Sequence, residues 1–138
     1  MLAKDVMKSN VKVIHFDRPV REAAELMEEE NCGSLPVEKN DKMVGMVTDR
    51  DIALRVVAQG KDPETTLVSE VMSEGIHYSF EDDEVSEVVQ KMVENHNRRM
   101  PVINQQKRLV GIVSLRDLAR KGMDEKLMQN ALSNIYPN

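Results

Sequence analysis

Two seven-residue segments share one pattern that suits the binding of a sugar phosphate. Each begins with glycine, runs through a β-prone stretch to a hydroxyl residue, and has an aspartate three positions after that hydroxyl. The segments are Gly45-Met46-Val47-Thr48-Asp49-Arg50-Asp51 and Gly111-Ile112-Val113-Ser114-Leu115-Arg116-Asp117. Free amides and the positive dipole end at a helix start favour an anion, and a carboxylate there can accept hydrogen bonds from ribose hydroxyls. The two hydroxyl–aspartate pairs are therefore candidate ligand-binding residues.

The same spacing also has a purely structural interpretation. A hydroxyl residue followed three positions later by an acidic residue is close to a capping box, in which both side chains bind free backbone amides of their own helix. Such a cap contributes about 1 kcal/mol to stability. Gene duplication would copy a cap as readily as a binding site, so both interpretations stay open.

The two segments belong to an internal repeat that fills most of the chain. Val6-Met7 recurs as Val71-Met72, and Pro36-Val37 recurs as Pro101-Val102, both 65 positions later. We place the first repeat at residues 1–62, the second at 67–122, and a C-terminal amphipathic tail at 123–138. Because a single core is marginal at this repeat size, we expect the two copies to pack on each other.

Each repeat is predicted to contain a strand, a helix, two strands and a second helix, which gives an α/β (α+β) fold. In the first copy, the first helix follows Pro19 and the second helix ends before Gly60. Asn40-Asp41 joins the last two strands as a hairpin. The expected elements cover residues 11–14, 20–27, 35–37, 43–47 and 52–57, then 76–79, 85–94, 100–103, 109–114 and 115–121. The tail carries Leu127, Ala131 and Ile135 at helical spacing and is expected to cover the protein's own helices or to meet a partner chain.

Composition excludes several classes of protein. Hydrophobic residues make up 41% of the 138, which is enough for a core and argues against disorder. The net charge of −5 argues against general nucleic-acid binding. With one cysteine, no internal disulfide can form; no apolar run approaches the length of a membrane span, and the N-terminus lacks a signal-peptide pattern. We therefore expect a cytoplasmic protein.

Patterns typical of enzymes and metal sites are absent from the sequence. There is no glycine-rich phosphate loop, no HExxH helix and no Ser-His-Asp order. Cys32 has no His or Asp partner nearby in sequence, and the spacing of His15, His77 and His96 matches no metal signature. We expect no catalytic residue, no metal site and no required cofactor, although a redox or metal function built around Cys32 stays as a minor alternative.

Taken together, the twice-repeated Val-Met, Pro-Val and Gly-x-Val-[Ser/Thr]-x-x-Asp motifs resemble a tandem pair of cystathionine β-synthase (CBS) domains, called a Bateman module. The resemblance covers residues 4–122. It implies two pseudo-two-fold-related β-α-β-β-α repeats packed sheet to sheet. It also implies clefts between the repeats that bind adenosine-containing ligands of the AMP, ADP, ATP, S-adenosylmethionine or NAD type.

The resemblance also implies roles for particular residues. Asp51 and Asp117 would hold ribose hydroxyls, and Thr48 and Ser114 would reach phosphate. The other residues expected at the ligand are Gly33, Ser34, Arg98, Arg99, Arg50, Arg116, Lys12 and His77. Each cleft is expected to draw on both repeats, so that Asp117 shares a site with Lys12 and Ser34. The Arg98-Arg99 pair, which replaces Gly33-Ser34, is expected to make the two clefts differ in charge.

The function that follows is a stand-alone, non-catalytic sensor that binds an adenosyl nucleotide as its regulatory ligand and signals to an unknown effector protein. A homodimer is expected as well; the apolar faces around Val20 and Val85 suit such contacts, but burial within one chain explains them equally. The alternative is a structural or protein-interaction module with vestigial clefts.

Overall fold

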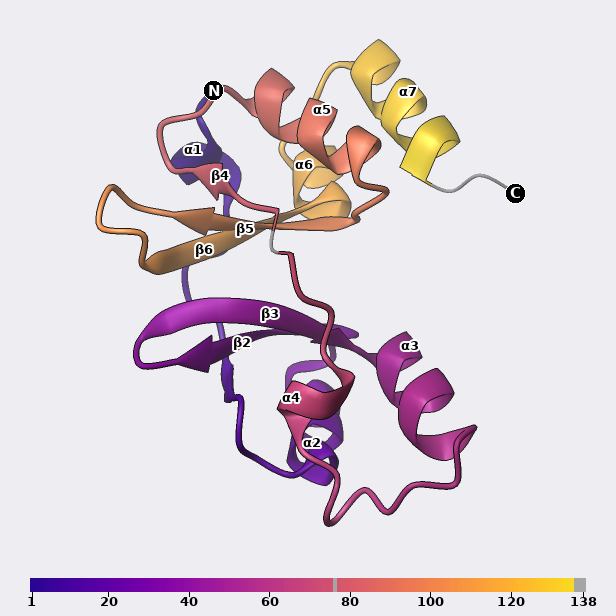
Figure 1. Ribbon diagram of the computed structural model, residues 1–138. Helices are drawn as coiled ribbons and strands as arrows, with labels where there is room; N and C mark the ends of the chain where they lie inside the picture. Colours follow the sequence, from indigo (N-terminus) through magenta and orange to yellow (C-terminus); the bar gives the residue numbers. More distant parts are fainter. Residues whose placement is uncertain (76, 136–138) are drawn as a thin grey trace. The chain divides into compact units, whose positions relative to one another are not determined.

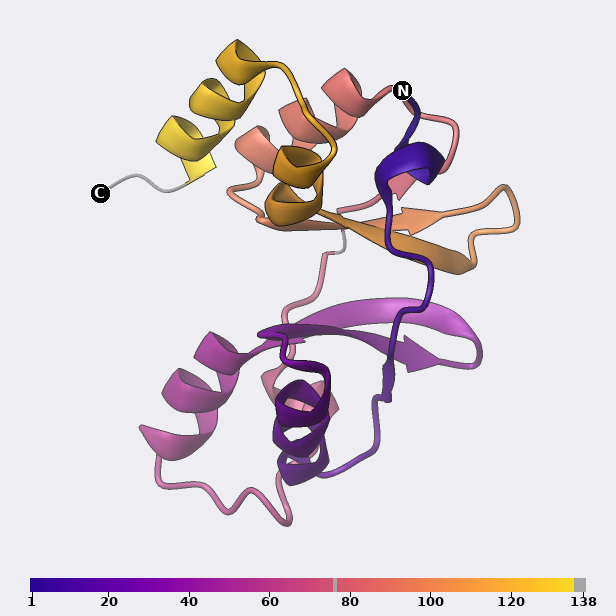
Figure 2. The same cartoon turned by 180° about the vertical axis from the view of Figure 1, so that it is seen from behind.

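The computed structural model describes residues 1–75 and 77–135, which form two compact units (Figures 1 and 2). The N-unit begins at Lys12 and ends before His77. The C-unit combines Met1–Val11 with the residues from His77 onward. Each unit is built on its own three-stranded sheet.

The N-unit places helices on one face of the sheet β1-β2-β3 (Figure 1). Strand β1 pairs parallel to β2, and β2 pairs antiparallel to β3. Asn40 and Asp41 join β2 to β3 with φ of 53° and 62°, as the hairpin prediction requires. The elements are β1 (Ile14–His15), α2 (Val20–Glu30), β2 (Ser34–Lys39), β3 (Lys42–Thr48), α3 (Asp49–Ile52), the π-helical turn η1 (Ala53–Val57) and α4 (Val68–Val71).

The C-unit repeats this plan on the sheet β4-β5-β6, with the same parallel and antiparallel pairings. Figure 2 shows α5 and α6 on one face of that sheet, with α7 beside α5. The elements are α1 (Ala3–Val6), β4 (Ser79–Phe80), α5 (Val85–Glu94), β5 (Arg99–Ile103), β6 (Leu109–Ser114), α6 (Leu115–Arg120) and α7 (Glu125–Ile135).

The predicted order of strands and helices is confirmed in both repeats, and so is the mixed α/β fold class. The prediction of the first strands was wrong in extent. Strand β1 begins at Ile14 instead of residue 11, because only Ile14 and His15 pair with β2. Strand β4 begins at Ser79, and Ile76, where the prediction placed its start, lies outside the described residues.

Each unit has a separate aliphatic core. In the N-unit, Leu35, Val37 and Val47 of the sheet are buried against α2 and α4. In the C-unit, the core includes Ala131 and Ile135 of α7. The C-terminal helix therefore covers helices of its own unit, which was one of the two expected roles of the tail.

The compact units do not coincide with the sequence repeats. The segment before the first repeat's strands lies in the C-unit, and the segment before the second repeat's strands lies in the N-unit. Helix α1 lies in the C-unit, where the Ala3 amide donates to the Asp83 carbonyl (2.8 Å). Helix α4 lies in the N-unit, where the Val68 amide donates to the Arg18 carbonyl (2.9 Å). Neither four-residue helix is among the predicted elements.

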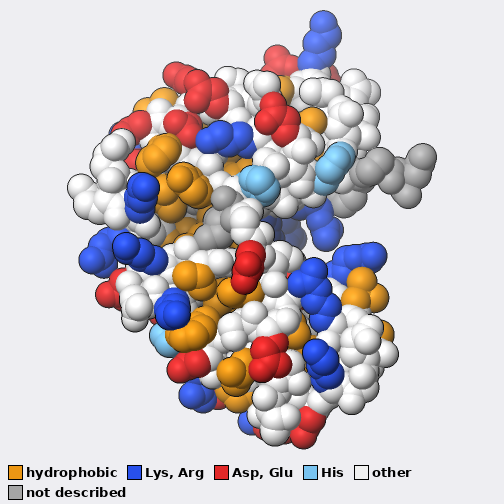
Figure 3. Space-filling model, in the orientation of Figure 1, with side chains coloured by type: hydrophobic (Ala, Val, Ile, Leu, Met, Phe, Trp, Pro, Cys, Tyr) orange, Lys and Arg blue, Asp and Glu red, His pale blue; other side chains and the backbone are white. Residues whose placement is uncertain are grey.

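The apolar faces considered for dimer contacts are used inside the units. Val20 is fully buried and Val85 is 6% exposed, both in their own cores. Large exposed hydrophobic side chains lie instead on η1, where Leu54 is 47% and Val57 is 72% exposed. Figure 3 shows hydrophobic side chains beside basic ones on this part of the surface, at the lower right of the view.

Candidate functional site

The turn from β3 into α3 brings Thr48 and Asp51 into reciprocal contact. The Asp51 amide donates to Thr48 Oγ1 (3.0 Å), and the Thr48 amide donates to Asp51 Oδ2 (3.0 Å). The Asp51 side chain is 12% exposed, and Arg55 Nη1 lies 3.9 Å from its Oδ1. This turn is thus a complete capping box, as the structural interpretation predicts.

The turn from β6 into α6 forms only half of that arrangement. The Asp117 amide donates to Ser114 Oγ (3.0 Å), and Ser114 is buried. The Asp117 side chain is half-buried, and no residue in the described part of the chain donates a hydrogen bond to its carboxylate. Both carboxylate oxygens of Asp117 are therefore available as acceptors, whereas Oδ2 of Asp51 already accepts from the Thr48 amide.

The first amide of each of these helices is bound in the same way. The Asp49 amide donates to the Gly33 carbonyl (2.9 Å), and the Leu115 amide donates to the Arg98 carbonyl (3.1 Å). These bonds attach the helix start to the strand that begins at Ser34 or Arg99. The predicted residues Gly33 and Arg98 therefore lie directly beside the hydroxyl–aspartate turns.

The second amide distinguishes the two turns. In the N-unit, the Arg50 amide donates to Asp49 Oδ1 (2.8 Å), so a carboxylate lies at the helix start, where a phosphate would bind. The corresponding residue in the C-unit is Leu115, which is buried and carries no charge. Asp49 is absent from the predicted site, although the signal was in the sequence, in the Thr48-Asp49 and Ser114-Leu115 pairs.

Sheet register brings further predicted residues beside each turn. Ser34 is the antiparallel partner of Thr48, and Arg99 is the partner of Ser114. Partners across an antiparallel pair lie on the same face of the sheet. Ser34 Oγ is buried and has no hydrogen-bond partner among the described residues. The predicted residues gathered within single units are Gly33, Ser34, Thr48 and Asp51, and Arg98, Arg99, Ser114 and Asp117.

The remaining four predicted site residues are exposed on the surface. Arg50 and Arg116 are exposed in the first turns of α3 and α6. Lys12 and His77 are exposed, and each precedes its strand by two positions instead of lying within it. The correction follows from the short pairing of β1 and β4 noted above.

A metal or thiol site finds little support in the geometry. Within residues 1–75 and 77–135, no group of three or more His, Cys, Asp or Glu side chains is arranged to hold a metal ion. Cys32 is half-buried, and its Sγ lies 3.5 Å from the Ser34 carbonyl oxygen as a weak donor. In the same described range, no helix is long and apolar enough to cross a membrane.

Sequence comparison identifies a family match in both repeats. Residues 3–58 and 68–124 each match the CBS domain. The CBS domain-containing protein YhcV of Bacillus subtilis is 41% identical over 132 residues, which cover 96% of this chain and 93% of YhcV.

Comparison of folds gives the same result. The crystal structure of Hypoxic Response Protein I with two coordinated zinc ions superposes with a TM-score of 0.80 at 36% identity, covering 87% of this chain and 98% of that one. The CBS domain pair of protein MJ0100, in complex with 5′-methylthioadenosine and S-adenosyl-L-methionine, gives a TM-score of 0.77 at 30% identity and covers 88% and 94%.

Proposed function

Because this chain belongs to the CBS domain family and carries two copies of the domain, we propose that it is a non-catalytic regulatory module for an adenosine-containing ligand. The ligand class includes AMP, ADP, ATP, NAD and S-adenosylmethionine. The MJ0100 pair, which binds two adenosyl compounds, supports this class. In this proposal the ligand changes how the module engages an effector protein, and no covalent chemistry takes place.

The observation that carries the proposal is the state of Asp117. Its carboxylate is half-buried at a helix start and accepts no hydrogen bond from the described residues, whereas the carboxylate of the equivalent Asp51 accepts one from the Thr48 amide. A pair of ribose hydroxyls can donate to both oxygens of such a carboxylate. Asp117 is therefore the proposed ribose-binding residue.

Residues beside Asp117 complete a proposed phosphate-binding region. Arg99 is the cross-strand partner of Ser114, and the Arg98 carbonyl is bound to the first amide of α6. Guanidinium groups form strong, directional hydrogen bonds with phosphate oxygens. We further propose that Lys12 and Ser34 contribute to the same ligand site from the other repeat, as the family resemblance implies.

The turn at Thr48 and Asp51 is proposed to bind the ligand more weakly. The Asp49 carboxylate already accepts a hydrogen bond from the Arg50 amide, and it would repel a phosphate at the same place. Asp51 also has less acceptor capacity left for ribose, because its Oδ2 already accepts from the Thr48 amide and its Oδ1 lies 3.9 Å from Arg55 Nη1. The two repeats are thus expected to differ in affinity, with the Asp117 turn as the stronger site.

Thermal unfolding with a panel of AMP, ADP, ATP, NAD and S-adenosylmethionine tests the proposal. A ligand present at about 100 times its dissociation constant adds ~2.7 kcal/mol, which raises the midpoint by roughly 5–10 °C in a chain of this size. The Asp117→Ala variant should lose this rise, whereas Asp51→Ala should retain most of it. Unchanged midpoints with every compound would refute ligand sensing and favour the interaction-module alternative.

A further inference from the structure

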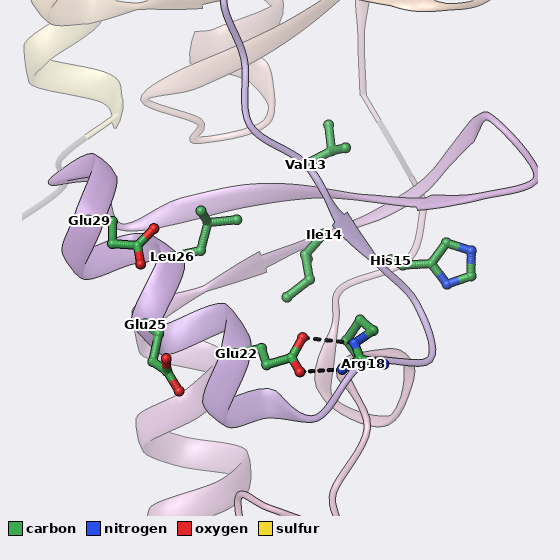
Figure 4. A pocket seen from close by; sticks show the side chains of 8 residues that line it. All are labelled: Val13, Ile14, His15, Arg18, Glu22, Glu25, Leu26 and Glu29. Carbon is green, nitrogen blue, oxygen red and sulfur yellow. Dashed lines mark hydrogen bonds and ion pairs between the residues drawn. The ribbon is translucent and has the colours of Figure 1, made fainter.

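A groove of about 350 Å³ lies between strand β1 and helix α2 of the N-unit. Figure 4 shows Leu26 and Ile14 between the helix and the strand, with the Glu22–Arg18 ion pair beside them and His15 directed away from the helix. None of the residues proposed for nucleotide binding lines it. The lining residues are Val13, Ile14, His15, Arg18, Glu22, Glu25, Leu26 and Glu29.

One wall of this groove is acidic. Glu22, Glu25 and Glu29 project from α2 at positions i, i+3 and i+7, which share one face of a helix. Arg18 donates to Glu22 (Nε to Oε2, 2.7 Å), and this bond holds the pKa of the Glu22 carboxyl below its usual range. Glu25 is paired with Arg21, whereas Glu29 has no ion-pair partner among the described residues. The wall therefore keeps a carboxylate that is free to meet a cation.

The corresponding place in the C-unit already holds a cation of the chain itself. Lys91 of α5 occupies the sequence position equivalent to Leu26, and Tyr78 is equivalent to Val13. The Lys91 ammonium donates to the Tyr78 carbonyl (3.1 Å) and lies 3.7 Å from Asp83 Oδ2. An alkylammonium group on a four-carbon chain thus bridges helix α5 and the segment that leads into β4.

The N-unit cannot make this contact internally, because Leu26 ends in methyl groups. We infer that the groove between β1 and α2 binds a primary alkylammonium group from outside the chain, presented as a lysine side chain of another polypeptide. The ammonium would be accepted by the Val13 carbonyl, as the Tyr78 carbonyl accepts Lys91, and the Glu29 carboxylate would add negative charge to the same groove. The methylene chain would lie against Ile14 and Leu26, as long basic side chains do on apolar surface.

The edge position of β1 favours a polypeptide as the source of the lysine. In the sheet order β1-β2-β3, β1 lies at the edge, and no strand among the described residues pairs with its other side, where the His15 carbonyl accepts from the Arg18 amide (3.2 Å). An extended segment that lies along this edge would present alternate side chains to the groove, with the Val13 carbonyl left for the lysine ammonium. One difference from the C-unit is that Arg18 stands where Asp83 does, but Glu22 neutralises its charge.

Titration with n-butylammonium, followed by amide chemical shifts of the full chain, tests the site. Shifts are expected in Val13–Arg18 and Glu25–Glu29, with a dissociation constant in the millimolar range. The chemical shifts of the counterpart amides near Tyr78 and Lys91 should not change. Uncharged n-butanol at the same concentrations is the matched control and should leave the chemical shifts of the groove amides unchanged.

Reciprocal substitutions sharpen this test. Leu26→Lys should fill the groove internally and remove the n-butylammonium shifts, while Lys91→Leu should create a second responsive site around Tyr78. Glu29 is exposed, so Glu29→Gln does not require repacking as a change at the half-buried Leu26 does. It should weaken n-butylammonium binding several-fold. Absence of groove shifts in the unaltered chain, or shifts that persist in both Leu26→Lys and Glu29→Gln, would overturn the proposal.

Peptides decide the source of the ammonium. The capped peptide acetyl-Val-Lys-Val-amide is expected to produce the same shifts at lower concentration than n-butylammonium, and acetyl-Val-Leu-Val-amide should produce none. Spermidine is the third probe. If spermidine binds in the groove and the lysine peptide does not, the site serves a free polyamine, and the inferred polypeptide partner is wrong.

Discussion

Thr48 and Asp51 bind each other's backbone amides, with both hydrogen bonds at 3.0 Å. Ser114 and Asp117 share only one of these bonds, from the Asp117 amide to Ser114 Oγ. The two aspartates come from the same repeated motif but have different surroundings. Duplication has therefore preserved the residue type at both turns while the capping function of the carboxylate is complete only at Asp51.

This difference predicts opposite outcomes for the two alanine substitutions. Asp51→Ala removes a carboxylate that caps its own helix, so the free energy of unfolding should fall by about 1 kcal/mol. Asp117→Ala removes a carboxylate without a described hydrogen-bond partner, so the loss should be clearly smaller. Urea unfolding of both variants without ligand measures the difference. Equal losses would show that the Asp117 carboxylate also acts as a cap.

The sequence allowed the elements of the repeat to be predicted but not the partners of its first segments. Helices α2, α5 and α7 have strong apolar periodicity, and the hairpin at Asn40-Asp41 follows from turn chemistry. Helices α1 and α4 have four residues each, too few for a periodic pattern to show. Their packing on a sheet far away in sequence depends on contacts that no local pattern specifies.

The candidate site was predictable to a similar depth. The repeated motif located Thr48, Asp51, Ser114 and Asp117, but it could not distinguish a cap from an open carboxylate. That distinction depends on whether the amide of the hydroxyl residue donates to the carboxylate, as the Thr48 amide does to Asp51. Conversely, the groove beside α2 is formed by residues whose sequence pattern indicates only a solvated acidic helix face.

A buried hydroxyl in the C-unit predicts a stabilising substitution. Ser79 is fully buried, and its Oγ has no hydrogen-bond partner among the described residues; its equivalent in the N-unit is the core residue Ile14. An unsatisfied buried polar group costs on the order of 1 kcal/mol or more. Ser79→Ala should therefore raise the free energy of unfolding by about 1 kcal/mol.

Ser114→Ala is the matched control for Ser79→Ala, since it removes a hydroxyl that does accept a hydrogen bond. It should lower stability by about 1 kcal/mol. Chemical denaturation of the two variants side by side measures the signs. A loss of stability in Ser79→Ala would mean that its hydroxyl is bound in solution.

Two glycines allow close approach of the short N-terminal segment of each repeat. A Cβ at Gly45 would lie 2.8 Å from both Met72 Sδ and the Ser73 carbonyl oxygen. A Cβ at Gly111 would lie 2.5 Å from Met7 Sδ and 3.0 Å from the Lys8 carbonyl oxygen. Each glycine-to-alanine substitution should therefore destabilise the protein by roughly 1–3 kcal/mol through overpacking.

Double substitutions separate the two cases. Met7→Ala removes the nearest atoms at Gly111, so it should offset part of the cost of Gly111→Ala. Met72→Ala should offset less of the cost of Gly45→Ala, because the Ser73 carbonyl oxygen, held by a hydrogen bond from the Met46 amide (3.1 Å), would still lie 2.8 Å from the new Cβ, whereas at Gly111 the Lys8 carbonyl oxygen lies 3.0 Å away. Thermal unfolding of the two double-mutant cycles gives the coupling energies. Equal coupling in both would contradict the role assigned to the Ser73 carbonyl.

The pair of His15 and Asp17 predicts a small acid dependence of stability. His15 Nδ1 lies 2.5 Å from Asp17 Oδ1, and this hydrogen bond lowers the pKa of the Asp17 carboxyl below its ordinary value. The contribution to stability is therefore present above the pKa of the unfolded chain and is lost as the pH falls through the lower pKa of the folded state. It is small because both side chains are substantially exposed.

Carbon-detected NMR titration of the Asp17 carboxyl measures this shift directly. His15→Ala should return the pKa of Asp17 toward its ordinary value. The pKa values of carboxyl groups that do not contact His15 should stay unchanged. The matched control is His96→Ala, which removes a histidine of the C-unit. If the pKa of Asp17 is the same with and without His15, the hydrogen bond does not form in solution.

The exposed apolar residues of η1 predict where a homodimer would form. Leu54 and Val57 are 47% and 72% exposed, so they present an uncovered apolar face of the N-unit. If two copies pair through this face, Leu54→Lys with Val57→Lys should convert the dimer to a monomer in light scattering. The midpoint of unfolding of the monomer should change little, because neither side chain is buried.

Leu132→Lys, at the 46% exposed Leu132 of α7, is the control and should leave the dimer intact. A dimer that survives the double substitution, or is lost only in Leu132→Lys, would place the contact elsewhere.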